Sequence, residues 1–322
     1  MEHLLEVIGL ETTFHGERGS GAAVDHVSFA VDAGETVCIV GESGCGKSVT
    51  SLSLLGLLAR NGRVTAGKAL FEGRDLLAMD EKELDGVRGA GISMIFQDAL
   101  SALNPVFTIG NQLTESIRAH LPLNKAAAHA RAVELLARVG LPDPEAAMKK
   151  YPHTLSGGQR QRVMIAMALS CGPRLLIADE PTTALDVTIQ AQIMALLRAL
   201  QAETGMSILL ITHDLGVVAQ MADRVLVMYA GQIVEQGPVK TLFEKPAHPY
   251  TQALLHSVPT IGGPERRLDS IRGTVPEHYQ NIHGCRFASR CPYAAVDCER
   301  PQEMRPLSPG HAARCNIAKE GA

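Results

Sequence analysis

The sequence predicts an α/β fold in which a phosphate-binding loop is built into a mixed sheet. An antiparallel β region, a helical region and a small cysteine-containing C-terminal extension accompany that sheet. Residues 41–48 fit the pattern G-x-x-x-x-G-K-[ST] at every fixed position. Several short apolar runs end in polar side chains, as buried parallel strands do. Four of the seven cysteines crowd into the last forty residues.

The composition argues against two broad classes of protein. There are 30 lysines and arginines against 34 aspartates and glutamates, so no large basic surplus favours nucleic-acid binding. No uninterrupted apolar run approaches the roughly 18–20 residues that span a bilayer, and the N-terminus lacks the pattern of a secretory signal. We therefore expect a soluble cytoplasmic protein without a nucleic-acid partner.

Short alternating apolar runs, broken by glycines, occupy residues 4–40. This pattern predicts a meander of antiparallel strands that leads into the phosphate loop. Phe14 lies in the first connection. Its ring suits stacking on an adenine, and it suits a core or turn position equally well, so both alternatives stay open here.

The phosphate loop stands in the expected context. Residues 36–40 are apolar and β-branched, which predicts a buried strand, and residues 49–58 predict a helix. Glycines let consecutive amides turn inward as an anion nest at the start of that helix. Lys47 is expected to reach the β- and γ-phosphates and Ser48 to ligate Mg²⁺, with the nest formed by Ser43, Gly44, Cys45 and Gly46. The loop predicts binding of a nucleoside triphosphate.

The next segments predict a hairpin, a short strand and a helical region. The pattern of residues 67–75 predicts the hairpin. Residues 94–96 predict a buried strand that is followed by Gln97. The Gln97 side chain could ligate Mg²⁺ or orient an attacking water. Residues 104–150 have apolar residues at helical spacing, with Gly140 as a helix stop, which predicts a helical insertion.

A second helix start with anion-binding character follows. Residues 155–159 read Leu-Ser-Gly-Gly-Gln, and residues 160–170 read as a helix. The residues expected to meet an anion there are Ser156, Gly157, Gly158 and Gln159.

Two further buried strands end in polar side chains. Residues 175–180 end in Asp179 and Glu180, which suit Mg²⁺ binding and proton abstraction from the attacking water. Residues 207–211 lead to His213. Each feature alone would read as turn charge or a structural histidine. Because ligands bind at the carboxyl ends of parallel strands, three such strands together favour a site.

Together these stretches resemble the nucleotide-binding subunits of ATP-binding-cassette (ABC) transporters, over about residues 1–240 with a helical subdomain at about 98–170. The resemblance implies hydrolysis of Mg²⁺-bound ATP, with Glu180 as general base. It also implies a head-to-tail pair of subunits, in which each ATP lies between the phosphate loop of one and the signature of the other. The implied motifs are the Q-loop (Gln97), signature (Ser156, Gly157, Gly158, Gln159), Walker B (Asp179, Glu180), D-loop (Asp186) and switch histidine (His213).

A closer resemblance is to the ATPases of dipeptide, oligopeptide and nickel importers, above all the dipeptide importers. It rests on residues 178–190 and on Pro-Ala-His-Pro-Tyr-Thr at 246–251, which marks the C-terminal extension, residues 241–322. The implied function is ATP-driven uptake of di- and oligopeptides. Nickel or glutathione import is the alternative within this branch. A soluble ABC ATPase outside transport is disfavoured, because the chain has neither a second cassette nor a long coiled-coil insertion.

The resemblance also implies partners and a location. They are a second ABC ATPase subunit, expected to be a paralogue, two transmembrane permease subunits, and an extracytoplasmic substrate-binding protein that acts through the permease. The chain is then expected as a peripheral protein on the cytoplasmic face of the inner membrane.

The C-terminal cysteines have the spacing Cys285-x₅-Cys291-x₆-Cys298-x₁₆-Cys315. In a cytosolic chain such clustering favours a metal over disulfides. Zinc sites commonly use cysteine pairs two to four residues apart, which this segment lacks, so a cluster fits better although the spacings are not those of ferredoxins. The family resemblance implies a [4Fe–4S] cluster at these four positions. Zinc and four unliganded thiols remain the alternatives.

Overall fold

The computed structural model describes residues 3–16, 19–98, 102–183, 185–257, 271–276 and 278–318. The chain forms two compact units. The first comprises Met1–Asp32, Thr36–Ala78 and Ile211–Ala322, and the second comprises Ala33–Glu35 and Met79–Leu210.

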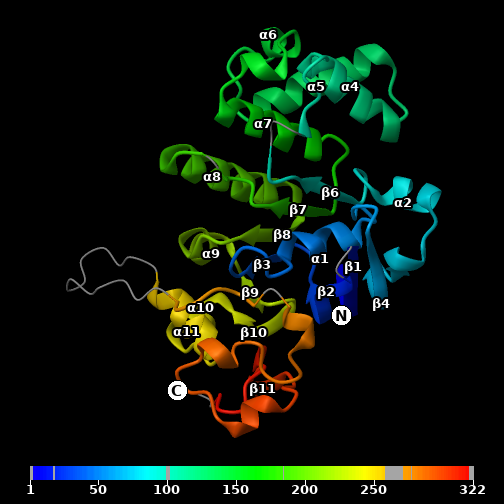
Figure 1. Ribbon diagram of the computed structural model, residues 1–322. Helices are drawn as coiled ribbons and strands as arrows, with labels where there is room; N and C mark the ends of the chain where they lie inside the picture. The colour runs from blue at the N-terminus through cyan, green and yellow to red at the C-terminus, as the bar shows by residue number, and fades with distance from the viewer. Residues whose placement is uncertain are drawn as a thin grey trace. The chain divides into compact units, whose positions relative to one another are not determined.

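The first unit contains an antiparallel sheet with the strand order β2-β1-β4-β5 (Figure 1). The central strand β1 pairs with both neighbours, Leu5 lying opposite Val31 and Phe71. Two residues in left-handed conformation, Glu72 and Gly73, turn the chain between β4 and β5, which confirms the predicted hairpin. The strands are β1 (Leu5–Gly16), β2 (Gly19–Val31), β4 (Gly62–Phe71) and β5 (Arg74–Asp75).

A second set of strands in this unit has the order β11-β12-β10-β9-β3. Every residue of β3 is buried, and β3 pairs in parallel with β9, Val37 opposite Arg224. The expectation that the antiparallel meander runs through residue 40 is therefore wrong for this last strand, because a strand buried on both faces suits a parallel position. The strands are β3 (Thr36–Val40), β9 (Arg224–Tyr229), β10 (Gln232–Pro238), β11 (Arg305–Ser308) and β12 (His311–Ala313).

The helices of the first unit are short. Helix α1 begins at Lys47 and ends at Leu54, earlier than the predicted residue 58, because Gly56 adopts a left-handed conformation that a helix cannot continue through. The others are α9 (Leu215–Met221), α10 (Val239–Glu244), α11 (Pro249–His256) and the 3₁₀ turns η1 (Leu76–Ala78), η3 (Tyr279–Asn281), η4 (Ala288–Arg290) and η5 (Val296–Glu299).

The second unit contains the strand order β8-β7-β6. Strands β6 and β7 are parallel, with Ile92 opposite Leu175. Strand β6 ends at Ile95, one residue earlier than predicted, and the Phe96 side chain that follows is 40% exposed. The bounds are β6 (Ile92–Ile95), β7 (Leu175–Asp179) and β8 (Ser207–Thr212), of which β8 contributes its residues up to Leu210 to this unit.

Helices dominate the rest of the second unit. Helices α4, α5 and α6 pack together, and α7 contacts α4, α5 and β6 (Figure 1). This confirms the predicted helical character of residues 104–150, and Gly140 follows α5 in a left-handed conformation, as a helix stop does. The helices are α2 (Glu81–Val87), α4 (Ile109–His120), α5 (Lys125–Arg138), α6 (Pro144–Met148), η2 (Pro152–Thr154), α7 (Gly157–Ala168) and α8 (Val187–Thr204).

Among the described residues, no helix is both long and apolar enough to cross a membrane.

Candidate nucleotide-binding site

The phosphate loop lies in the first unit, between β3 and α1. A side chain at Gly41 would collide with the Met228 carbonyl oxygen, so only glycine fits there. Gly46 caps α1 with a φ of 107°, and a Cβ on it would lie 2.6 Å from the carbonyl oxygen of Ala23. These two positions explain why the pattern needs glycine: the backbone passes too close to neighbouring strands for any side chain.

Lys47 is the first residue of α1, and it is only 5% exposed. Its ammonium donates hydrogen bonds to the carbonyl oxygens of Gly41 at 2.8 Å and Glu42 at 3.0 Å, so the charge lies across the loop. Ser48 follows it and is half-buried. A buried ammonium at a helix start, where the first backbone amides have no partner within the helix, suits the binding of phosphate oxygens.

The other loop residues divide by exposure. Ser43 and Gly44 are exposed, whereas Cys45 and Gly46 are buried. Burial raises the pKa of the Cys45 thiol, so it stays protonated and unreactive at neutral pH. The cysteine therefore packs the base of the loop, while Ser43 and Gly44 face solvent.

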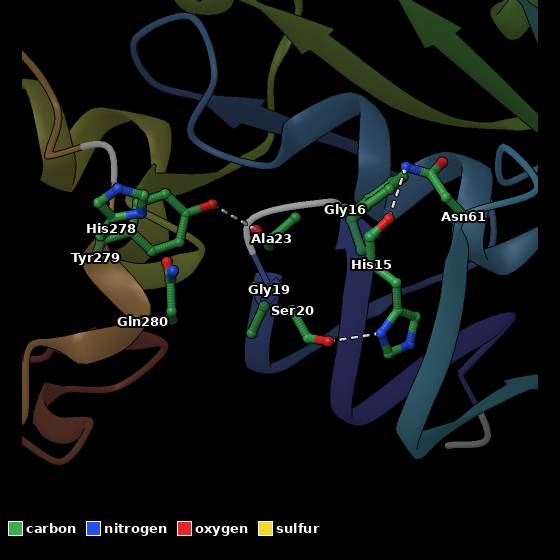
Figure 2. Close-up of a pocket in the computed structure, with 12 residues that line it drawn as sticks. His15, Gly16, Gly19, Ser20, Ala23, Asn61, His278, Tyr279 and Gln280 are labelled. Carbon is green, nitrogen blue, oxygen red and sulfur yellow. Dashed lines mark hydrogen bonds between the residues drawn. The ribbon is translucent and has the colours of Figure 1, made fainter.

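Phe14 lies near the end of β1, where it pairs with Gly21 of β2 and Gly62 of β4. Its side chain is half-buried and lines a cavity of about 550 Å³ together with parts of β2 and the η3 turn (Figure 2). The structure thus places Phe14 at a cavity wall and not in the fully buried core, and its stacking role stays a prediction.

In the second unit, Gln97 and Glu180 come together although 83 positions separate them in the sequence. The Gln97 amide nitrogen donates to a Glu180 carboxylate oxygen at 3.1 Å, and the Thr183 hydroxyl donates to the same oxygen at 2.8 Å. Asp179, the last residue of β7, is 4% exposed. Parallel pairing of β6 with β7 brings their carboxyl ends to one edge, as the sequence predicted.

Glu180 has a φ of 45°, a left-handed conformation that is uncommon for residues other than glycine, asparagine and aspartate. Two hydrogen-bond donors fix its carboxylate in place. Backbone strain that surrounding structure maintains is often found at functional sites.

The signature residues form the start of α7. The Ser156 hydroxyl accepts from the amide of Gln159 at 3.3 Å, and the Gln159 side chain accepts from the amide of Ser156 at 3.1 Å. This capping box starts the helix at Gly157, three residues earlier than predicted. A Cβ on Gly158 would lie 2.9 Å from the Ile189 side chain, so glycine permits close packing against α8.

Asp186 is the capping residue at the start of α8, and His213 comes one residue before the capping residue of α9. The Asp186 carboxylate caps α8 by accepting from the amide of Ile189 at 2.9 Å. His213 belongs to the first unit, where its side chain is exposed between β8 and α9.

The four C-terminal cysteines lie close enough for their thiols to interact electrostatically. Burial first, and then the charges of the other three thiols, raises the pKa of the Cys285 thiol to about 11. The Cys285 sulfur accepts a backbone hydrogen bond from Phe287, and the Cys291 sulfur accepts one from Tyr293. Among the described residues, no three of these sulfurs fall within 4.8 Å of one another.

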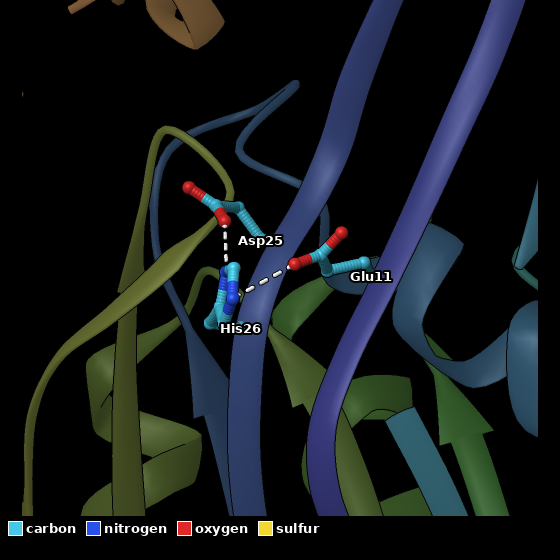
Figure 3. Close-up of side chains that lie close together, drawn as sticks. All are labelled: Glu11, Asp25 and His26. Carbon is cyan, nitrogen blue, oxygen red and sulfur yellow. Dashed lines mark hydrogen bonds and ion pairs between the residues drawn. The ribbon is translucent and has the colours of Figure 1, made fainter. Parts of the chain in front are cut away.

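A compact polar cluster outside the predicted site joins β1 and β2. Both ring nitrogens of His26 bind carboxylates, Glu11 at 2.9 Å and Asp25 at 2.6 Å (Figure 3). The second Asp25 oxygen accepts from Gln232 and from Arg286. The imidazole thus bridges the two carboxylates, and the three side chains bring one ligand atom each to within 4.8 Å of one another.

Sequence reasoning missed the contacts that the C-terminal extension makes with the phosphate loop. Arg290 binds both carboxylate oxygens of Glu42, at 2.6 and 3.0 Å, and Tyr250 accepts from the Glu42 amide at 2.9 Å. Glu42 occupies a variable position of the loop pattern, so no signal in the motif marked it.

Comparisons with known proteins identify the architecture. A family model described as "ABC transporter" matches residues 24–183, and one described as "Oligopeptide/dipeptide transporter, C-terminal region" matches residues 234–298. The dipeptide transport ATP-binding protein DppD of Bacillus subtilis is 51% identical over 324 aligned residues, which cover 100% of this chain and 97% of that protein.

The chain belongs to the ATP-binding-cassette transporter family. DppD of Escherichia coli is 49% identical over 99% of this chain and 98% of that protein. Among solved structures, the cassette MJ0796 in a dimeric post-hydrolysis state with ADP and Pi has a TM-score of 0.66 at 27% identity, covering 73% of this chain and 98% of that one. The cbiO1 protein of Clostridium perfringens has a TM-score of 0.65 at 29% identity, covering 76% and 92%. The predicted family and fold class are confirmed, and the chain is an ABC-type ATPase subunit.

Proposed function

We propose that this chain hydrolyses ATP to energise the import of di- and oligopeptides through separate permease subunits. The observation that carries the proposal is the combination of an intact cassette motif set with the C-terminal region named for oligopeptide and dipeptide transporters. Full-length relatives named for dipeptide transport support peptides over nickel or glutathione.

In the proposed mechanism Lys47 and the amides of the loop from Ser43 to Ser48 bind the β- and γ-phosphates. The Lys47 ammonium exchanges its bonds to the Gly41 and Glu42 carbonyls for bonds to phosphate oxygens. Ser48, Gln97 and Asp179 offer the hydroxyl, amide and carboxylate oxygens that Mg²⁺ prefers, and they would hold it. When bound, Mg²⁺ neutralises charge on the phosphates.

Glu180 is proposed to take the proton of the attacking water. The hydrogen bonds from Gln97 and Thr183 hold its carboxylate in one orientation, which suits a base that must meet a water at fixed geometry. His213 is proposed to donate a hydrogen bond to the γ-phosphate as its charge develops.

The signature residues are proposed to act on the ATP of a partner subunit, a paralogue of this chain. Ser156 is exposed at the start of the 12-residue helix α7, whose free amides attract anions. Asp186 is exposed too, and the Val187 side chain beside it is 82% exposed, as a residue covered by a partner would be. The similar cassette MJ0796 is described as dimeric, which supports the presence of a partner subunit.

The permease is proposed to dock on the helical region of the second unit. Val106 and Phe107, just before α4, are 71% and 49% exposed and so present apolar surface to solvent. Docking there would hold the chain at the cytoplasmic face of the membrane, with a substrate-binding protein acting through the permease from the other side.

The four C-terminal cysteines are proposed to hold a [4Fe–4S] cluster. The four thiols are close enough to interact electrostatically, and their sequence spacing lacks the short cysteine pairs that zinc sites commonly use. Backbone hydrogen bonds to three of them, Cys285, Cys291 and Cys315, would stabilise thiolate ligands. The cluster would order the extension and take no part in hydrolysis.

Reconstitution of this chain with its permeases and paralogous ATPase in liposomes tests the transport function. We expect ATP hydrolysis to rise when a peptide-loaded binding protein is added, and Lys47→Ala in this chain to remove that rise. Stimulation by nickel or glutathione and not by peptides would contradict the proposed substrate.

A further inference from the structure

The cavity lined by Phe14 has walls from segments far apart in the sequence. The ends of β1 and β2 form one side, and the η3 turn of the C-terminal extension forms another (Figure 2). Its volume of about 550 Å³ falls in the range of small-molecule sites.

The cavity adjoins the phosphate loop through Ala23, which lines it. The Ala23 carbonyl oxygen lies so close to Gly46 that a Cβ there would be 2.6 Å away. The Gly231 amide donates to the Cys45 carbonyl oxygen at 2.8 Å, and a Cβ on Gly231 would lie 3.0 Å from the Ala23 oxygen. A nucleotide whose phosphates lie in the loop would thus have the cavity next to it for its base.

The η3 turn is held rigidly against this cavity. The Tyr279 hydroxyl donates to the Ala23 carbonyl oxygen at 3.2 Å, and burial raises the pKa of that hydroxyl so that it keeps its proton. The Arg286 guanidinium lies 5.2 Å from the centre of the Tyr279 ring and also binds Asp25 and the Ala230 carbonyl. The turn is therefore preorganised and needs little ordering when a ligand binds.

Gln280 extends from this turn into the cavity. Its side chain is half-buried, and within the described part of the chain its carboxamide has no hydrogen-bond partner. Its Nε2 lies 3.3 Å from the place where a Cβ on Gly21 would stand, so glycine at that position makes room for it. A carboxamide offers one acceptor and two donor hydrogens, which matches the edge of adenine, where an amino group lies beside a ring nitrogen.

We propose that the C-terminal extension forms one wall of the nucleobase pocket and that Gln280 hydrogen-bonds the edge of the adenine ring. The inference rests on the proposed ATP site and deepens it, because the base belongs to the same nucleotide. The extension would then contribute to the choice of nucleotide in addition to any structural role of its cysteines.

Calorimetric titration of the full chain with ATP, GTP and inorganic tripolyphosphate tests the inference. Gln280→Ala should weaken ATP binding by about fivefold, the loss of one net hydrogen bond, and leave tripolyphosphate binding unchanged. The preference of the Gln280→Ala variant for ATP over GTP should also fall. Asn281→Ala removes an exposed amide from the same turn that does not line the cavity, and it should bind all three ligands as the wild type does.

Gln280→Glu gives a second variant of nearly the same size. It lacks the amide donors, and it too should lose affinity for ATP and not for tripolyphosphate. The inference is overturned if either variant binds ATP like the wild type, or loses ATP and tripolyphosphate affinity equally. A wild type that binds no ATP would refute the proposed function itself, whereas ATP binding that is independent of Gln280 refutes only this inference.

Discussion

Among single residues, Glu180 of the second unit shows how a carboxylate is held in one place. Glu180 follows the buried strand β7 in a left-handed conformation, with φ of 45°. Gln97 and Thr183 both donate to one of its oxygens. Strain in the backbone and two donors on the carboxylate together restrict the side chain to one orientation.

Replacement of Glu180 by glutamine should reduce ATP turnover by at least about 10²-fold, because the amide cannot accept a proton from water. ATP affinity should be retained, since the phosphates are held by Lys47 and the loop amides. The measurement is the hydrolysis rate and nucleotide affinity of the assembled transporter. Glu203→Gln alters an exposed glutamate of α8 and serves as the control. Near-normal hydrolysis by Glu180→Gln would remove Glu180 from the role of base.

Among the structural elements, the C-terminal extension binds the phosphate loop through hydrogen bonds to Glu42. The Arg290 side chain at the end of η4 is 4% exposed and binds both oxygens of Glu42. It also lies over the rings of Tyr229 and Phe287, and Tyr250 of α11 accepts from the Glu42 amide. The hydrogen bond to Glu42 raises the pKa of Arg290 further, so the pair stays charged.

Arg290→Ala should lower the free energy of unfolding by about 1.5–3 kcal/mol, as loss of hydrogen bonds to a charged group does. It should also weaken ATP binding, because Glu42 is part of the phosphate loop. Urea unfolding and nucleotide titration measure the two effects. Arg300→Ala breaks an exposed pair with Asp297 and should change neither by more than about 0.5 kcal/mol. Equal effects of the two variants would show that the Glu42 contact does not stabilise the loop.

The cysteine segment of the extension gives a prediction for the same element. Anaerobic purification should yield iron and acid-labile sulfide at about four atoms of each per chain, as one [4Fe–4S] cluster contains. Cys298→Ser should lower both, because it removes one of the four ligands. Cys171→Ser alters a half-buried thiol of the second unit and should leave both unchanged. Zinc without sulfide would contradict the cluster, and a metal-free extension would contradict the site.

At the level of the whole molecule, the proposed function gives the chain two half-sites for ATP. The phosphate loop belongs to the first unit and the signature to the second. In the proposed head-to-tail pair, the two half-sites of one chain serve different ATP molecules. Hydrolysis then depends on closing and reopening the pair, which is the motion that a permease can use.

Lys47→Ala and Gly157→Asp in this chain should therefore impair different ATP sites of the heterodimer. Trapped nucleotide should fall by about half with each lesion and to near zero with both in one chain, since two sites are independent targets. Gly86→Asp places the same substitution at an exposed glycine with open space around it, and should retain full occupancy. If the double variant loses no more nucleotide than either single variant, both lesions act on one site and the head-to-tail arrangement is wrong.

Elements whose geometry depends on residue type at fixed spacing can be predicted from the amino-acid sequence alone. The loop at 41–48 needs glycine where the backbone passes Met228 and Ala23, and those glycines are visible as a pattern. The strands that lead to Gln97 and Asp179 could be predicted to lie side by side, because ligand-binding residues gather where parallel strands bring their carboxyl ends to one edge. The predicted antiparallel meander was wrong only at β3, which pairs in parallel with β9. The alternation of apolar and polar residues along a strand does not reveal which other strand pairs with it.

The contacts of the C-terminal extension could not be predicted from the sequence and became visible in the tertiary structure. Arg290 and Glu42 are 248 positions apart, and Tyr279 and Ala23 are 256 apart. No periodicity or motif links such residues, because their pairing depends on how separate segments pack and not on any local backbone preference. The wall that the extension adds to the Phe14 cavity arises in the same way, from the packing of η3 against β2.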